Sequence, residues 1–297
     1  MEERTAPSAE TLVKALSQLG LEGVRGEDIS AFTDEEDGAE YAVWRVKRAK
    51  GDFVLKREKA NEIVTYRTFF NEKKPYAPAF FGDTELEGER YFLLEYVEGE
   101  TLSLCTRGKL IKALDALIAM QDEFWQREEF YDKGMTLSRS AELIKNRGLY
   151  LEDERLEEAF ALFVRVYSQT PLTLCHDDLL PFNLLVGERA VLFDWEEGGM
   201  LPYPQSFARL IAHTEEREGA FFYMKREDYD LAIEYYYENL VKKHGIAYRD
   251  YRRTLDCFLF YEYCEWVMLG NRYDARGDER YSRSLDLAKK CAERLLA

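Results

Sequence analysis

The first third of the chain alternates short apolar runs with polar turns, a pattern typical of β-strands. Before these runs, leucine and valine residues spaced three or four apart predict an amphipathic helix at residues 9–19. A second helix is expected at residues 58–70, where four large apolar side chains share one face. Strands are expected at residues 28–33, 41–47, 52–56, 79–82 and 90–96. After the first helix the order is therefore βββαββ, which predicts a small sheet with a helix packed on it.

From Leu102 onward the apolar positions recur at helical intervals, so the rest of the chain is predicted to be mainly helical. The expected helices lie at residues 109–124, 138–145, 156–168, 206–216, 229–244, 248–269 and 282–296. One tight hairpin interrupts them, formed by residues 184–186 and 190–193 around a turn at 187–189. We therefore predict an α+β protein with an N-terminal part at residues 1–97, a C-terminal part at residues 98–297 and a hinge near Glu98-Gly99.

Length and composition indicate a globular protein with a substantial core. The chain has 297 residues, of which 46% are hydrophobic and 14% aromatic. No apolar run is long enough to cross a bilayer, and residues 1–9 lack the apolar segment of a signal peptide. The five cysteines show no ligand-like spacing, which favours reduced, mostly buried thiols. We expect a cytoplasmic protein with no membrane partner, either a monomer or a homodimer.

The formal net charge of -16 makes nucleic acid a poor partner, because phosphate binding relies on Lys and Arg. A strongly acidic enzyme can attract a cationic substrate. The alternative is that the charge serves only solubility.

The clearest chemical signal is a loop with the spacing His176-x-Asp178-x4-Asn183, followed by Asp194 after the predicted hairpin. The hairpin would return Asp194 to the side of Asn183. Magnesium-dependent phosphoryl transfer needs such groups: one carboxylate to orient a hydroxyl, and an Asn with a second Asp to hold the metal. The alternative is that these side chains only cap a surface turn, as Asp and Asn often do.

The segment Leu174-Cys175-His176-Asp177-Asp178-Leu179-Leu180-Pro181-Phe182-Asn183, with Phe193-Asp194-Trp195, resembles the catalytic motif of the aminoglycoside phosphotransferase and choline kinase superfamily. That family usually reads H-G-D-L-H-x-x-N followed by I-D-F/W. Asp177 stands where Gly is common, and Leu180 where a second His is common. The resemblance implies a two-lobed protein-kinase-like fold. Its small N-lobe would hold a five-stranded antiparallel sheet plus a helix, and its larger C-lobe would be mainly helical.

The resemblance also assigns roles to the loop residues. It implies that Asp178 is the catalytic base, that Asn183 and Asp194 hold Mg²⁺, and that ATP is the phosphoryl donor, with GTP not excluded. His176 is expected to pack beneath the loop. A small-molecule hydroxyl would be the acceptor.

In the N-terminal part, Lys56 ends an apolar strand, where it could reach nucleotide phosphates. In the resembled family a helix Glu holds this Lys. Glu62 best fits that position, and Glu58, one turn earlier on the same face, is the rival. The alternative for Lys56 is a solubilising charge on an edge strand.

Two further segments concern the nucleotide. The resemblance places adenine against the Glu95 carbonyl and the Val97 N–H, whereas the alternative is a buried strand end followed by a turn. Where protein kinases carry a glycine-rich loop, this chain has an acidic turn at residues 33–38, which we expect to point away from phosphates.

The resemblance also places substrate selection at the residues just after Asp194 and on helices late in the chain. The candidate residues are acidic or aromatic: Glu196, Glu197, Glu262, Glu265 and Trp266. Such groups can hold an ammonium by charge and cation–π attraction, as on an aminoglycoside, choline, ethanolamine or an amino sugar. The alternative is an aromatic core stripe with a solvated acidic edge. For the whole chain, the rival to a small-molecule kinase is a catalytically silent nucleotide-binding regulator.

Overall fold

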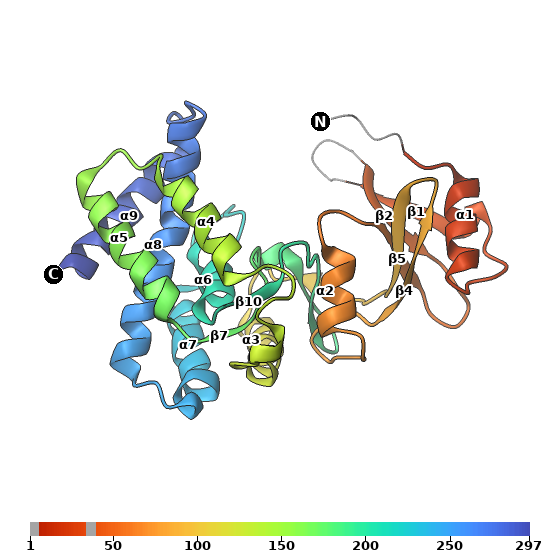
Figure 1. Ribbon diagram of the computed structural model, residues 1–297, viewed down its shortest axis with the longest axis horizontal. Helices are drawn as coiled ribbons and strands as arrows, with labels where there is room; N and C mark the ends of the chain where they lie inside the picture. The colour runs from red at the N-terminus through yellow and green to blue at the C-terminus, as the bar shows by residue number, and fades with distance from the viewer. Residues whose placement is uncertain (1–5, 34–39) are drawn as a thin grey trace.

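An antiparallel sheet of five strands organises the N-terminal part (Figure 1). The structure, a computed structural model, describes residues 6–33 and 40–297. The strands, in the spatial order β1-β2-β3-β5-β4, are β1 Ile29–Thr33, β2 Glu40–Val46, β3 Phe53–Arg57, β4 Phe80–Leu86 and β5 Glu89–Glu95. All five predicted strands are present. The predicted acidic turn lies, apart from Thr33, outside the described residues.

Strand β4 is longer than predicted because a tight turn joins it directly to β5. Glu87 and Gly88 both have positive φ, at 56° and 78°, and Leu86 pairs with Glu89 across the turn. The sheet therefore continues to the end of the hairpin.

A helix covers each face of this sheet. Helix α1 (Ala9–Gln18) begins at Ser8, whose side chain accepts a hydrogen bond from the Thr11 N–H, and packs in a cluster with Leu55 and Leu93. Helix α2 (Glu62–Phe69) packs on the opposite face, in the core that contains Phe92 and Leu94. Successive β5 residues thus enter different cores, as the two-residue period of a strand requires.

Helix α2 begins later than residue 58 because Ala60 has a φ of 54°, which a right-handed helix excludes. The Glu58 side chain instead accepts a hydrogen bond from the Ile63 N–H, at 3.2 Å.

The chain crosses into the C-terminal part just after β5. Strand β6 (Glu100–Thr101) pairs with β8 (Leu184–Val186), which forms the predicted hairpin with β9 (Ala190–Leu192). A Cβ at Gly99 would lie 3.0 Å from the Val186 backbone, so glycine allows the crossing segment to approach the hairpin closely.

Helices build most of the C-terminal part, with α8 at its centre (Figure 1). They are α3 Arg107–Glu123, α4 Leu137–Gly148, α5 Glu154–Gln169, α6 Pro204–Ala212, α7 Arg226–Tyr236, α8 Tyr248–Arg272 and α9 Glu279–Leu296. Helix α7 continues as a π-helical turn at Tyr237–Val241 and a 3₁₀ turn at Lys242–His244, which together fill the predicted range. Every predicted helix is present.

Besides β6, two short strands were not predicted. Strand β7 (Leu172–Cys175) pairs antiparallel with β10 (Gly199–Pro202), and every residue of both is buried. The molecule is an α+β protein with a five-stranded N-terminal sheet and a helical C-terminal part, as predicted.

All five cysteines are free and buried. In the described parts of the chain, no helix has the length and hydrophobicity that crossing a membrane requires.

Candidate active site

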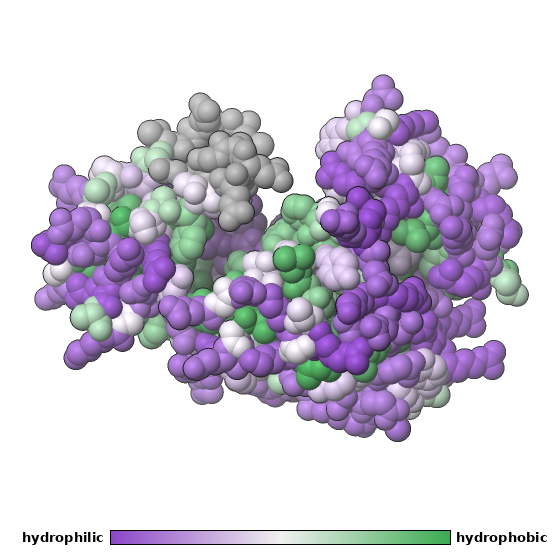
Figure 2. Space-filling view, turned by 180° about the vertical axis from the view of Figure 1, so that it is seen from behind, coloured by the Kyte–Doolittle hydropathy of each residue, from purple (hydrophilic) through white to green (hydrophobic). Residues whose placement is uncertain are grey.

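The candidate loop lies where the two parts of the molecule meet. On the face seen in Figure 2, a notch separates the N-terminal part from the helical part, with apolar residues at its floor. The loop follows β7 and ends in a 3₁₀ turn at Pro181–Asn183. The Phe193 N–H donates to the Asn183 carbonyl at 3.2 Å, which brings Asp194 beside Asn183, as the hairpin predicted.

His176 ties the loop to its surroundings from below. Its main-chain N–H donates to Ser206 Oγ at 2.8 Å, and its Nε2 pairs with the Phe193 carbonyl at 2.8 Å. The buried ring also lies 4.6 Å from that of Trp195. Burial lowers the pKa of His176 and so favours the neutral ring. The residue lies beneath the loop, where the sequence predicted it.

Asn183 and Asp194 each present an oxygen at the end of a constrained segment. The buried Asn183 side chain donates through Nδ2 to the Asp178 carbonyl at 2.8 Å, so its Oδ1 is the atom left for a ligand. Asp194 has a φ of 68°, a left-handed conformation that is uncommon outside Gly and Asn/Asp and that recurs at functional sites.

Lys56 links the sheet to both α2 and Asp194. Its Nζ lies 2.6 Å from Glu62 Oε2 and also contacts Asp194 Oδ1. Burial raises the pKa of Glu62 to about 7, with Lys56 opposing the shift. Burial opposes the charge on Lys56 too, but the two carboxylates raise its pKa above the ordinary value. The buried lysine is therefore charged at neutral pH.

Glu58, the rival partner, is engaged elsewhere. Its carboxylate pairs with Arg90 at 3.0 Å and caps the start of α2. In the structure, the helix carboxylate that contacts Lys56 is thus that of Glu62.

Asp178, the candidate base, is half exposed, and an arginine holds its side chain. Arg209 of α6 donates to Asp178 Oδ1 through Nε at 3.1 Å and through Nη2 at 2.8 Å. The second carboxylate oxygen, Oδ2, makes no bond to this arginine.

A cavity of about 230 Å³ opens beside Asp178. Its charged lining is mostly acidic, with the guanidinium groups of Arg147 and Arg209 among seven carboxyl groups: Asp177, Asp178, Asp194, Glu196, Glu197, Glu262 and Glu265. Four of the five predicted acceptor residues thus line one cavity that also contains the candidate base and a candidate metal ligand.

Trp266 was predicted to belong with Glu262 and Glu265, but it does not line the cavity. The Arg280 guanidinium lies over its ring, 4.2 Å from the centroid. On α8 the residues that reach the cavity are Tyr261, Glu262 and Glu265, which lie on one face of the helix. Trp266 is the next residue after Glu265 and lies outside that face.

The cavity carboxyl groups differ in their partners. Glu262 and Glu265 both contact Arg209 Nη1, the former at 2.9 Å, while Glu196 pairs with Lys59 at 3.1 Å. Within residues 6–33 and 40–297, the Glu197 side chain has neither an ion-pair nor a hydrogen-bond partner. Asp177 accepts a hydrogen bond from Gln205 Nε2, and burial, with the Glu262 charge adding to it, raises the pKa of Asp177 to about 6.

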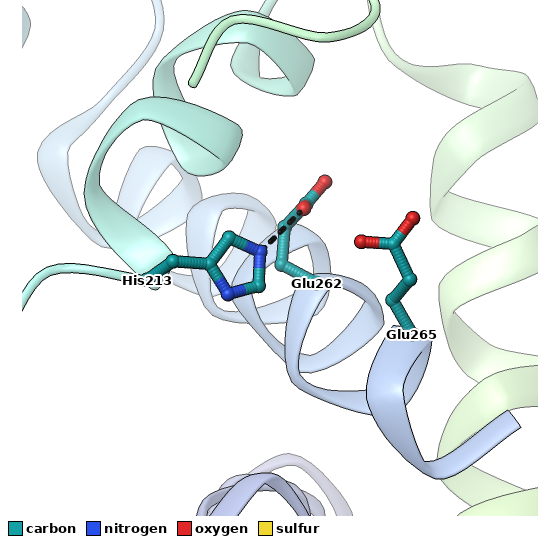
Figure 3. Close-up of side chains that lie close together, drawn as sticks. All are labelled: His213, Glu262 and Glu265. Carbon is teal, nitrogen blue, oxygen red and sulfur yellow. Dashed lines mark hydrogen bonds and ion pairs between the residues drawn. The ribbon is translucent and has the colours of Figure 1, made fainter. Parts of the chain in front are cut away.

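His213, Glu262 and Glu265 lie close enough together to suggest a metal site (Figure 3). The His213 Nε2 and Glu262 Oε2 atoms are 3.4 Å apart. Arg209 Nη1 contacts all three side chains, so a guanidinium already supplies the positive charge of this cluster. The group is an arginine-centred network.

The predicted adenine contacts lie at the end of β5. The Glu95 side chain accepts from Arg189 at 2.6 Å and from the Ala79 N–H at 3.1 Å, which braces the strand end against the β8–β9 turn. Among the described residues, the half-buried Val97 N–H has no hydrogen-bond partner.

Arg209, Arg147 and Gln205 were missed by reasoning from the sequence alone. A signal existed for Arg209, because it interrupts the apolar run of α6 and a buried arginine requires carboxylate partners. The sequence did not identify those partners.

A sheet-bearing N-terminal part joined to a helical part, with an H-x-D-x4-N loop at their junction, defines the kinase-like class of small-molecule phosphotransferases. The sequence pattern of the APH phosphotransferase enzyme family matches residues 33–240, which is more than half of the chain. The protein belongs to this family and is a small-molecule kinase.

Solved structures share the fold at low sequence identity. One is a thermostable mutant of aminoglycoside phosphotransferase APH(4)-Ia in complex with AMP-PNP and hygromycin B, with a TM-score of 0.57, 12% identity and coverage of 90% of this chain and 93% of that one. Another, from Haemophilus somnus 129PT, is assigned as a fructosamine-3-kinase, with a TM-score of 0.51, 12% identity and coverage of 96% and 97%. APH(3'')-Id from Streptomyces rimosus, bound to ADP and streptomycin, gives a TM-score of 0.50, 16% identity and coverage of 74% and 89%. A comparison with curated proteins finds no match.

Proposed function

We propose that the protein transfers the γ-phosphoryl group of ATP to a hydroxyl of a small amine-bearing or otherwise cationic molecule. The observation that carries this proposal is that Asp178 and Asp194 line the same acidic cavity, while Lys56 contacts Asp194 from the sheet side. A phosphoryl donor and a hydroxyl acceptor could therefore meet at Asp178.

The donor would lie between the two parts, which we divide at residues 97 and 98. Lys56, held by Glu62, would contact the phosphates, and the Glu95 carbonyl and Val97 N–H would contact the base. The structural neighbours solved with AMP-PNP and ADP support nucleotide binding. GTP carries the same triphosphate, so Lys56 does not distinguish it from ATP.

The residues present fit a magnesium ion. Asn183 Oδ1 and the Asp194 carboxylate are hard oxygen donors, which Mg²⁺ prefers. When bound, the ion would neutralise charge on the phosphate oxygens. Asn183 and Asp194 would hold it, and the ties of Asn183 to Asp178 and to the β8–β9 hairpin would fix these ligands.

In the reaction Asp178 would orient the acceptor hydroxyl and take its proton. The acceptor oxygen would form a bond to the γ-phosphorus, the bond between that phosphorus and the β,γ-bridging oxygen would break, and ADP would leave with the electron pair. Positioning and electrostatics supply most of the catalysis in phosphoryl transfer, which suits a site built from ion pairs.

The acceptor class follows from the cavity charge. Seven carboxyl groups against two guanidinium groups favour a cation, and the relatives solved with hygromycin B or streptomycin hold amine-bearing compounds. A metabolic amine such as choline, ethanolamine or an amino sugar has the same chemistry.

The test is ATP consumption with Mg²⁺ across a panel containing hygromycin B, streptomycin, choline, ethanolamine, glucosamine and neutral sugars, with product mass as the readout. We expect a gain of one phosphoryl group on a cationic acceptor. Binding of ATP without any turnover, even slow hydrolysis, would instead indicate a silent nucleotide-binding regulator.

A further inference from the structure

Arg209 joins the candidate base to two of the acidic residues expected to bind the acceptor. Its guanidinium is largely buried, with the side chain 14% exposed, and it contacts Asp178, Glu262 and Glu265. We propose that Arg209 is a positioning residue that fixes the orientation of Asp178, and that Glu262 and Glu265 hold Arg209 instead of binding the acceptor. This inference rests on the proposed function.

The geometry at Asp178 supports a positioning role. Both Nε and Nη2 donate to the same oxygen, Oδ1, at 3.1 and 2.8 Å. When a planar guanidinium donates two hydrogen bonds to one carboxylate oxygen, it restricts rotation of that carboxylate. The ammonium group of a lysine would not restrict it in this way. Asp178 is 49% exposed and, without this grip, would be free to change rotamer. Oδ2 remains for the acceptor hydroxyl.

The geometry at α8 supports the second half of the proposal. Glu262 lies 2.9 Å from Arg209 Nη1 and is almost fully buried, and Glu265 contacts the same nitrogen. A cationic acceptor that paired with these carboxylates would compete with the largely buried guanidinium of Arg209, whose charge they help to compensate. Glu197 has no such partner among the described residues, so it is the carboxylate best placed to meet an acceptor cation.

The principal test is the Arg209→Lys variant, assayed with Mg²⁺, ATP and each acceptor of the panel above. Lysine keeps the positive charge among the carboxylates but loses the two-point grip on Oδ1. We expect kcat to fall about ten- to a hundredfold, which is the usual effect of misplacing an acid–base group. The KM for ATP should stay within about twofold. A thermal melt within a few degrees of the unchanged chain establishes that the variant folds.

The different roles proposed for the carboxylates give a second test. A purely structural role would not produce separate effects on kcat and on the acceptor KM. Glu262→Gln should lower kcat and leave the acceptor KM nearly unchanged, because it loosens Arg209. Glu197→Gln should raise the acceptor KM several-fold at nearly constant kcat. Arg107→Lys is the control for Arg209→Lys: Arg107 is also paired with two carboxylates, Asp228 at 2.7 Å and Glu227 at 3.4 Å, but it is more exposed and lies away from the acidic cavity. It should change neither constant.

The outcomes separate this inference from the function on which it rests. If the unchanged chain phosphorylates an acceptor and Arg209→Lys retains full kcat, the positioning role is wrong while the function stands. A Glu262→Gln variant that raises only the acceptor KM would make Glu262 an acceptor ligand and overturn the second half. If the unchanged chain turns over no member of the panel, the proposed function fails and the inference fails with it.

Discussion

At the scale of single residues, Asp178 is the side chain on which the proposed chemistry depends most. In Asp178→Asn, Oδ1 can still accept hydrogen bonds from Arg209, but this position no longer carries a basic carboxylate. We expect kcat to fall about a hundredfold or more, the usual loss when a general base is removed. Calorimetry should show unchanged Mg·ATP affinity, and melting should show an unchanged fold. A kcat near that of the original chain would rule out this residue as the base.

The raised pKa of Asp177, the residue before the candidate base, leads us to expect that stability depends on pH. Its folded-state pKa, about 6, lies above the ordinary value of 3.8, so the folded protein holds the proton more tightly than the unfolded chain. The free energy of unfolding should therefore decrease as the pH rises from about 4 to about 6. The charged and polar groups facing Asp177 are Glu262, Arg147, Arg209 and Gln205.

The Asp177→Asn variant removes this contribution. Relative to the unchanged chain, it should be more stable at pH 7.5 than at pH 4.5 by on the order of 2 kcal/mol. This is less than the full shift allows, because pH 4.5 still lies above the ordinary pKa of 3.8 and part of the effect falls at lower pH. Urea unfolding at the two pH values measures the difference. Asp132→Asn, at an exposed position, is the control and should leave the pH dependence unchanged. Equal differences at both pH values would show that Asp177 ionises normally.

Substitution of Asp194 tests whether nucleotide binding depends on Mg²⁺ held by this residue. Asp194→Ala removes a hard oxygen ligand and one of the two carboxylates that hold Lys56. We expect nucleotide affinity to lose its dependence on Mg²⁺, which calorimetry with ATP in the presence and absence of the ion would show. Mg²⁺-dependent binding of unchanged strength would mean that other residues hold the ion.

The site residues differ in how far the sequence could predict them. Asp178, Asn183 and Asp194 were predictable as a group because one loop and one short hairpin connect them, and the spacing alone brings them together. The role of Arg209 depends on α6 packing against α8, whose Glu262 is 53 residues further along the chain. No local pattern specifies that contact.

At the scale of elements, strands that pair with a neighbour in the sequence were predicted, and strands that pair with a distant segment were not. The β8–β9 hairpin was predicted from its turn and its two apolar runs, which are adjacent in the sequence. Strands β7 and β10 escaped prediction because they are only four residues long, are buried throughout and so show no alternation, and pair across a long stretch of chain.

The contact between β3 and α2 also yields a prediction. Glu62 contacts Lys56, whereas Glu58 pairs with Arg90. Glu62→Gln should lower kcat/KM for ATP about tenfold or more, since a charge-assisted hydrogen bond contributes about 1.5–3 kcal/mol. Glu58→Gln should leave turnover nearly unchanged and lower only the melting temperature. The reverse ranking would mean that α2 shifts when nucleotide binds.

At the scale of the whole molecule, the net charge of -16 and the acidic cavity favour the same kind of acceptor. If charge attracts a cationic acceptor, added salt should weaken its binding, because the Debye length falls from about 10 Å at 0.1 M to about 3 Å at 1 M. The acceptor KM should therefore rise several-fold over this range, and more than the KM for ATP, because Lys56, the proposed phosphate contact, is largely buried. Glu197→Gln should flatten the dependence, since it removes the cavity carboxylate that has no ion-pair or hydrogen-bond partner among the described residues. A neutral acceptor in the panel, or an acceptor KM that does not respond to salt, would mean that the acidity of the molecule serves solvation alone.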